Sequence, residues 1–134
     1  MPFPVEEKYI KEAEVVLDVT FPPLFKQKMI ERNGGGAYSD EKDIDFQIHP
    51  FFDKSNKKRI SRTCNHIVLE TKKAKKDLPF IPPNCINIGS DAYGNLILLL
   101  HDTDKKLKDD LYLFDLQYRE LSKIADSIFE FDFE

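Results

Sequence analysis

The chain has 134 residues, 41% of them hydrophobic, with eleven Phe and no Trp. This length predicts a single domain over residues 1–134 that buries a core without disulfide or metal staples. The composition excludes a disordered chain, and no apolar run approaches the roughly 18 residues of a membrane span. Two cysteines cannot build a disulfide framework, and the N-terminus has no signal-peptide pattern, so we expect a cytoplasmic protein.

The net charge of −4 is unevenly distributed along the chain. Residues 1–50 carry six basic and ten acidic side chains, residues 51–78 carry nine and three, and residues 79–134 carry five and eleven. This small negative charge argues against a nucleic-acid-binding protein. Four of the nine cations in residues 51–78 lie at the C-terminal end of a predicted helix. Cations are favourable there, so we interpret them as a solvated helix end. The chain is thus an acidic body with a basic insert.

The first half of the chain predicts two helices and a strand. Apolar residues recur at helical spacing over residues 5–17, which predicts an amphipathic helix. A second helix over 22–33 begins with prolines and ends at glycine, as the two helix ends prefer. Gly34, Gly35 and Gly36 then predict a mobile or tightly turned exit. Alternation over 44–49 predicts a half-buried strand.

The second half predicts a helix, three strands and a closing helix. Residues 61–76 have helical spacing, with Ser61 as the expected N-cap and Cys64 on the buried face. Strands are expected over 86–88, 96–100 and 111–116, joined as an antiparallel meander. A closing helix is expected from five apolar residues at helical spacing: Leu121, Ile124, Ala125, Ile128 and Phe129. We interpret Phe131 and Phe133 as core residues. The prediction is an α+β fold, a mainly antiparallel sheet flanked by about four helices.

No residue pattern points to catalysis, a metal or a cofactor. Gly34, Gly35 and Gly36 follow a helix instead of opening one, which is wrong for a phosphate cradle. The cysteines and histidines lack zinc-site spacing, and the serines lack the signature of a nucleophile. We therefore expect neither an enzyme nor a cofactor or metal. The alternative that stays open is a small enzyme or metal protein using His49, His66 or His101.

Several short motifs occur in an order that resembles a known family. They are Phe21-Pro22-Pro23-Leu24-Phe25, Asn33-Gly34-Gly35, Leu78-Pro79, Ile86-Asn87-Ile88-Gly89, Tyr93-Gly94-Asn95 leading into Leu96-Ile97-Leu98-Leu99, Leu111-Tyr112-Leu113-Phe114, and Ile124-Ala125-Asp126-Ser127-Ile128-Phe129-Glu130-Phe131. Together they resemble the SUKH superfamily, the SMI/KNR type of domain.

The resemblance implies a non-catalytic interaction domain. Bacterial members are typically immunity proteins (antitoxins) that bind and neutralise a polymorphic toxin, often a nuclease. Fungal members belong to regulators of cell-wall assembly, so a general protein-interaction or regulatory module without a toxin partner is the alternative. We expect a toxin protein as the partner, with no direct contact to nucleic acid or membrane. The sequence leaves the oligomeric state open.

Two acidic loops are the candidate partner-binding residues. A compact acidic protein is suited to mask the basic cleft of a nuclease, because carboxylates steer association and mimic phosphate. We expect the 40–45 loop and the 102–110 hairpin to contribute the carboxylates, and two tyrosines to act as aromatic anchors. The candidate residues are Tyr38, Asp40, Glu41, Asp43, Asp45, Tyr93, Asp102, Asp104, Asp109 and Asp110.

Overall fold

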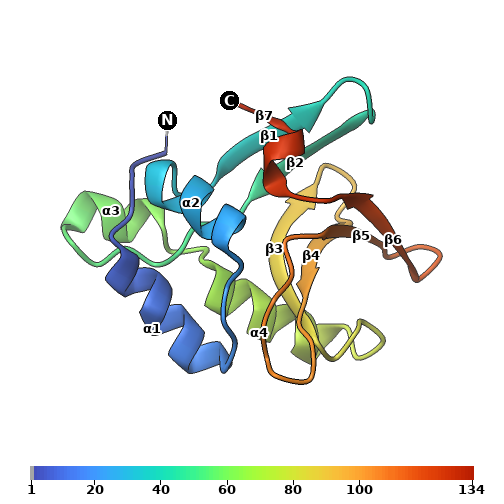
Figure 1. Cartoon of the computed structure of the whole chain (residues 1–134), viewed down its shortest axis with the longest axis horizontal. Coiled ribbons are helices and arrows are strands. Elements are labelled where there is room, and N and C mark those ends of the chain that lie inside the picture. Colours follow the sequence, from blue (N-terminus) through green and yellow to red (C-terminus); the bar gives the residue numbers. More distant parts are fainter. Residues whose placement is uncertain (1) are drawn as a thin grey trace.

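The computed structural model describes residues 2–134 as one curled sheet with helices on both of its faces (Figure 1). The helices are α1 (Glu7–Leu17), α2 (Pro23–Glu31), α3 (Lys57–Arg62), α4 (Ile67–Asp77) and the 3₁₀ helix η1 (Ile128–Glu130). The strands are β1 (Gly35–Ser39), β2 (Ile44–Ile48), β3 (Cys85–Asp91), β4 (Leu96–Leu100), β5 (Leu111–Asp115), β6 (Glu120–Ala125) and β7 (Asp132–Phe133). The predicted α+β class with an antiparallel sheet is confirmed.

All strands pair antiparallel in the order β6-β5-β4-β3-β2-β1-β7, and the short link between the two edge strands requires curvature. A flat sheet of this width would separate its edges by about 29 Å, at about 4.8 Å per strand. Only residues 126–131 join β6 to β7. When fully extended, the chain from the end of β6 at residue 125 to the start of β7 at residue 132 spans at most about 25 Å. The sheet therefore curls, and η1 with β7 reaches β1, where Ala37 pairs with Phe133 (Figure 1).

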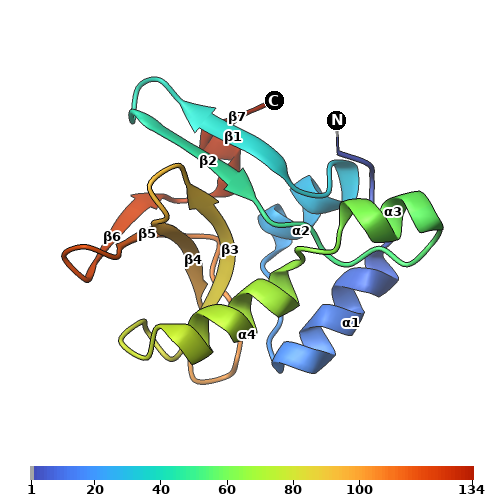
Figure 2. The ribbon, with the colours of Figure 1, turned by 180° about the vertical axis from the view of Figure 1, so that it is seen from behind.

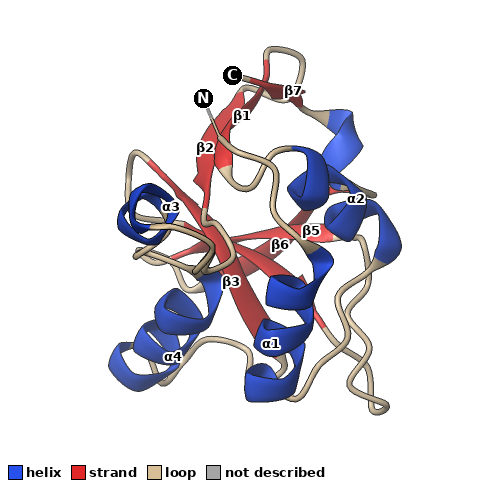
Figure 3. Cartoon of the chain, turned by 90° about the vertical axis from the view of Figure 1, so that its left-hand side faces the viewer, coloured by secondary structure: helices blue, strands red, loops and turns tan. Residues whose placement is uncertain are grey.

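The two faces of the sheet bury separate cores. On one face α1 and α2 supply Ile10, Phe25 and Met29, which pack with sheet residues such as Ile88 and Ile97. On the other face α4 runs along β3, and its Ala74 joins Leu98 and Phe114 in a smaller cluster (Figure 2). Figure 3 shows α2 and α4 on opposite sides of the strands. Each fully buried large side chain contributes about 1.5 to 3 kcal/mol of hydrophobic stabilisation.

The glycine-rich segment after α2 turns tightly, which is one of the two exits predicted for it, and then continues as a strand that was not predicted. Gly34 and Gly35 have φ of 95° and 89°, a left-handed conformation that turns the chain sharply after α2. Residues 35–39 then pair with 44–48, forming the β1–β2 hairpin. Phe131 is buried and packs edge-on against Phe46, as expected for a core residue.

The helix expected over 61–76 is interrupted. Residues 63–66 separate α3 from α4. Each of the two helices has an N-cap residue that the sequence did not indicate. Asn56 Oδ1 accepts from the Arg59 amide at 2.9 Å, and His66 Nδ1 accepts from the Leu69 amide at 3.3 Å. Ser61 lies inside α3 instead of capping it, and Cys64 is exposed in the connection.

The expected closing helix is wrong. Residues 120–125 form the edge strand β6, whose pairing with β5 places Leu121 opposite Phe114, and only η1 is helical after it. Only three of the α-helices, α1, α2 and α4, have nine or more residues. The expected set of about four helices is therefore not matched, because the closing helix is absent and the short helix α3 was not expected as a separate element. Within residues 2–134, no helix has both the length and the apolar character needed to cross a bilayer.

Candidate functional site

The β1–β2 hairpin and the β3–β4 turn enclose a groove of about 920 Å³, here called the acidic groove. Tyr38 lies opposite Asp45 on β2 and opposite Asp132 on β7, and residues that face each other across antiparallel strands share one face of the sheet. The groove is lined by Tyr38, Ser39, Asp40, Asp43, Ile44, Asp45, Phe46, Gln47, Ser90, Asp91, Ala92, Tyr93, Leu113 and Glu134.

Five carboxylates line the acidic groove: Asp40, Asp43, Asp45, Asp91 and Glu134. Among its described lining residues there is no lysine or arginine. Lys42, in the turn between β1 and β2, is paired instead with Glu130 at 3.0 Å. A concave surface lined by one sign of charge concentrates the field and attracts cationic groups. The groove is therefore suited to bind basic side chains.

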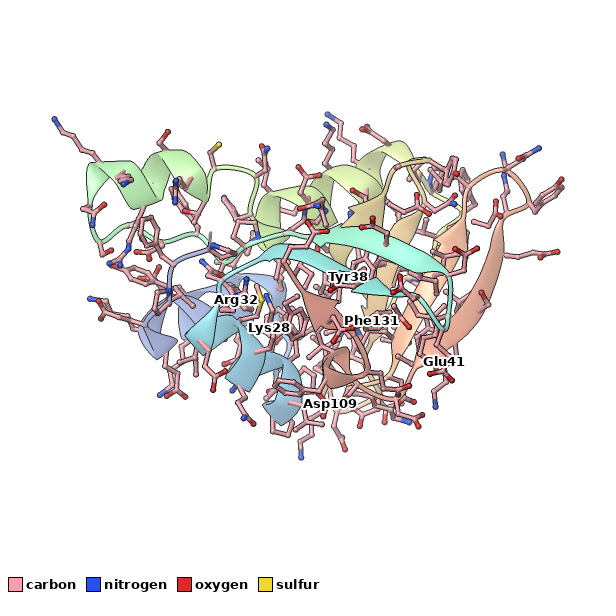
Figure 4. The ribbon with its side chains drawn as sticks, turned by 90° about the horizontal axis from the view of Figure 1, so that it is seen from above. Lys28, Arg32, Tyr38, Glu41, Asp109 and Phe131 are labelled. Atoms are coloured by element: carbon pink, nitrogen blue, oxygen red, sulfur yellow. The ribbon has the colours of Figure 1, made fainter. Side chains whose placement is uncertain are left out.

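The structure brings together half of the residues proposed from the sequence. Tyr38, Asp40, Asp43, Asp45 and Tyr93 all line the acidic groove. Glu41 is exposed in the same turn but does not line the groove; Figure 4 shows it at the far end of the hairpin from Lys28. The hairpin thus brings three of the four carboxylates proposed in the 40–45 loop to one surface.

The β3–β4 turn is held rigid by Asp91. Its Oδ1 accepts from the amides of Tyr93 and Asn95, both at 2.9 Å, and its Oδ2 accepts from the Asn95 side chain at 3.1 Å. Tyr93 at the tip is 89% exposed. An exposed aromatic side chain on a turn fixed by hydrogen bonds loses little entropy on binding, which favours it as an anchor.

The second proposed acidic loop, residues 102–110, lies at the opposite end of β3 and β4 from the acidic groove (Figure 1). Asp102 accepts from the amides of Lys106 and Asp104, and these hydrogen bonds hold the pKa of its carboxyl below the usual value. Asp104 is exposed in the same turn. The Asp102 carboxylate therefore shapes the β4–β5 connection.

Asp109 and Asp110 make contacts that hold the fold. Asp109 Oδ1 accepts from the Phe25 amide at 3.2 Å and so caps the start of α2, whose own N-cap is Pro22; burial raises the pKa of this carboxyl. Asp110 pairs with Lys123 at 3.5 Å. The four acidic residues of the 102–110 segment are thus not assembled with the groove.

Sequence reasoning missed five polar lining residues: Ser39, Gln47, Ser90, Asp91 and Glu134. Alternation along 44–49 placed Gln47 on the same face as Asp45, which was the available signal. Glu134 reaches the groove only because β7 pairs with β1, and nothing local in the sequence indicates that pairing.

Glu70 acts on both His49 and His66, whereas His101 directly follows β4. Burial lowers the pKa of His49 and of His66, and His66 caps α4 while stacking on Phe52 at 4.7 Å. His101 Nδ1 lies 2.8 Å from the Asp102 carbonyl oxygen. In the described part of the chain, no three His, Cys, Asp or Glu side chains are grouped to hold a metal ion.

The fold and groove define an α+β domain with an exposed, negatively charged sheet face. The family model for the SMI1 / KNR4 family (SUKH-1) matches residues 4–131, so the chain belongs to this family and the resemblance seen in the sequence is confirmed. No curated protein and no solved structure matches the chain significantly.

Proposed function

We propose that this chain is a cytoplasmic bacterial immunity protein that binds a cognate toxin, a nuclease, and neutralises it without catalysing a reaction. The observation that carries the proposal is the acidic groove, five carboxylates and two tyrosines on an exposed sheet face, in a chain of the SUKH-1 family. That family is one often used for immunity proteins, which supports this role over a catalytic one.

The chemistry of a nuclease explains why such a groove would neutralise it. Nucleases hold the phosphate backbone with lysine and arginine, and these side chains form a basic cleft. Carboxylates on Asp40, Asp43 and Asp45 would pair with the same cations and exclude the substrate. Complementary charge also raises the association rate, and Tyr38 and Tyr93 would supply apolar contact area between the charges.

The experiment co-expresses the tagged chain with the large protein encoded beside its gene and measures both complex formation and cell survival. The test variant is Asp40→Lys with Asp45→Lys, which reverses two charges of the groove. The matched control is Glu31→Lys with Asp77→Lys, which makes the same charge change at exposed positions outside the groove.

The wild type and the control variant are expected to recover the neighbouring protein and to protect the cells. The groove variant is expected to lose protection and to bind at least about a hundredfold more weakly, because two attractions become repulsions. Equal binding by both variants would contradict the proposed surface. Recovery of regulatory proteins without any protection would contradict immunity and favour the general interaction module.

A further inference from the structure

A small apolar pocket lies between α1, the start of α4 and the segment that follows β2 (Figure 2). This cavity of about 170 Å³ is here called the α1–α4 pocket, and none of its lining residues belongs to the acidic groove. An apolar cavity of about 150 Å³ admits a benzene ring, so the pocket has room for one bulky apolar side chain. Its lining includes Tyr9, Ala13, Val16, Phe51, Phe52 and Val68.

The walls of the α1–α4 pocket are fixed by the fold. The rings of Phe52 and His66 stack with their centroids 4.7 Å apart, and the side chain of His66 is held as the N-cap of α4. Phe51 is buried and packs edge-on against Phe21 in the main core. A group that enters a pocket with fixed walls does not have to order them, which lowers the entropic cost of binding.

The lining of the pocket has no net charge. Glu12 and Lys54 form an ion pair with 3.1 Å between Oε2 and Nζ. Burial lowers the pKa of His66 against the opposing charge of Glu70, so this ring is neutral at pH 7. Val16 lines the pocket and remains 53% exposed. The pocket is therefore suited to an apolar group and not to an ion.

Lysines continue from the pocket along the exposed side of α4. Lys72 lies one helical turn beyond Val68, and Lys76 lies one turn beyond Lys72. Both are exposed, as is Lys73, and none of the three forms an ion pair within the described residues. The helix dipole favours cations in the last turn, which includes Lys76, but Lys72 and Lys73 precede that turn. The exposed side of α4 therefore has an excess of positive charge beside an apolar pocket.

We propose that this surface docks an acidic amphipathic helix of a partner protein, with one bulky apolar side chain in the α1–α4 pocket and carboxylates beside Lys72 and Lys76. Residues four apart on a helix are about 6 Å apart along its axis, so a helix aligned with α4 presents apolar and acidic side chains at matching spacing. An extended segment is disfavoured, because the backbone groups of α1 and α4 are paired within these helices and offer it no partner.

The experiment measures fluorescence anisotropy of a stapled helical peptide titrated with the full chain. The peptide has Phe at its centre and Glu four and eight positions to either side, which allows both orientations along α4. One control peptide replaces Phe by Ala, and the other replaces each Glu by Gln.

Two variants of the chain test the two parts of the surface. Ala13→Leu fills the pocket from within, and Lys72→Gln with Lys76→Gln removes two lysines of α4. The matched control is Lys57→Gln with Lys108→Gln, two exposed lysines outside this surface. The circular dichroism and the melting temperature of each variant establish that it is folded.

The wild type and the control variant are expected to bind the peptide with Phe and Glu at least about tenfold more tightly than either control peptide. Ala13→Leu should abolish the preference for Phe over Ala, and the lysine variant should abolish the preference for Glu over Gln. Unchanged preferences in these variants would overturn the proposal, as would a wild type that binds none of the peptides.

Two other occupants of the surface are distinguished in the same series. Binding to phosphatidylserine vesicles that the lysine variant abolishes would overturn the proposal in favour of a membrane surface. Self-association of the wild type that Ala13→Leu abolishes would overturn it in favour of a second copy of the chain. None of these outcomes depends on the proposed immunity function, because the measurements use no toxin and leave the acidic groove unchanged.

Discussion

The acidic groove and the basic helix α3 lie beyond the two ends of β2 and have opposite charge (Figure 2). The cations Lys57, Lys58, Arg59 and Arg62 all belong to this six-residue helix, so a run of basic residues in the sequence becomes a basic surface directly. The groove instead gathers residues from the β1–β2 hairpin, the β3–β4 turn and the C-terminal end of the chain. Local charge runs therefore predict surfaces built by helices better than surfaces built by strand pairing.

The strand β2 connects the two surfaces. Asp45 near its start lines the acidic groove, and the chain that follows Ile48 leads to α3. Changes in β2 or its pairing should affect both surfaces, and changes in α3 or in the turns should affect only one. The predictions below test this division, starting with the largest expected effect.

The first prediction concerns the pairing of β2 with β3. A Cβ atom on Gly89 would overlap the backbone oxygen of Gln47, so Gly89→Ala forces the two strands apart. We expect a loss of about 3 kcal/mol in the free energy of unfolding, measured by urea denaturation, and weaker partner binding at the acidic groove. The control is Gly94→Ala, where the added Cβ meets nothing within 4 Å and only the φ of 84° opposes it; it should cost about 1 kcal/mol.

The second prediction concerns Lys28, a lysine at the base of the β1–β2 hairpin that is only 2% exposed (Figure 4). Its Nζ donates to the carbonyls of Arg32 and Gly34, and burial, followed by the charge of Arg32, lowers its pKa to about 7. The unfolded chain keeps this proton up to its ordinary pKa near 10.5, so the free energy of unfolding should rise as the pH increases from about 7 to 10.

Lys28→Met removes the buried charge and should flatten this pH dependence. We expect the variant to be more stable than the wild type by about 2 kcal/mol at pH 6, after the loss of two hydrogen bonds to carbonyls is subtracted. Urea denaturation at pH 6 and pH 9 measures both values. A wild type that is more stable at pH 6 than at pH 9 would contradict the lowered pKa of Lys28.

The third prediction concerns the charge of the groove alone. Asp40→Asn with Asp45→Asn removes two carboxylates without adding repulsion. We expect the association rate with the proposed toxin partner to fall about tenfold at low salt and the difference to shrink as salt increases, because the attraction is screened. Stopped-flow mixing measures this rate. The melting temperature should be nearly unchanged, since both side chains are exposed.

The fourth prediction concerns the start of α3. Asn56→Ala removes the side chain that accepts from the Arg59 amide, which should cost about 1 kcal/mol in the free energy of unfolding and loosen α3. Urea denaturation measures this cost, and partner binding at the acidic groove should stay unchanged. Weaker binding at the groove would show that the two surfaces are not independent.

The elements that the sequence predicted are those with local signals. Helix α1, helix α2 and strand β2 were expected over 5–17, 22–33 and 44–49, within a few residues of their observed bounds. Two of the three failures have tertiary causes, and the third is the helix expected over 61–76, which is divided into α3 and α4. The glycines of β1 have low strand propensity, which pairing with β2 and β7 overcomes, and pairing with β5 overrides the helical spacing of 121–129.

The candidate site was predictable only in part. Loop position and charge identified Asp40, Asp43 and Asp45, which the structure places together with Tyr38 and Tyr93. The same reasoning grouped the 102–110 acids with them, because loop composition contains no information on which end of a sheet a loop occupies. The capping role of Asp109 depends on contact with α2, 84 positions earlier in the chain.

Hydrogen exchange of the complex tests the central claim most directly. The exchange rates of the amides of this chain are compared with and without the proposed toxin partner. The account predicts slower exchange over residues 38–45 and 90–93, with exchange in α3 unchanged. Protection of α3 without any change in the hairpin and the β3–β4 turn would contradict the acidic groove as the binding surface.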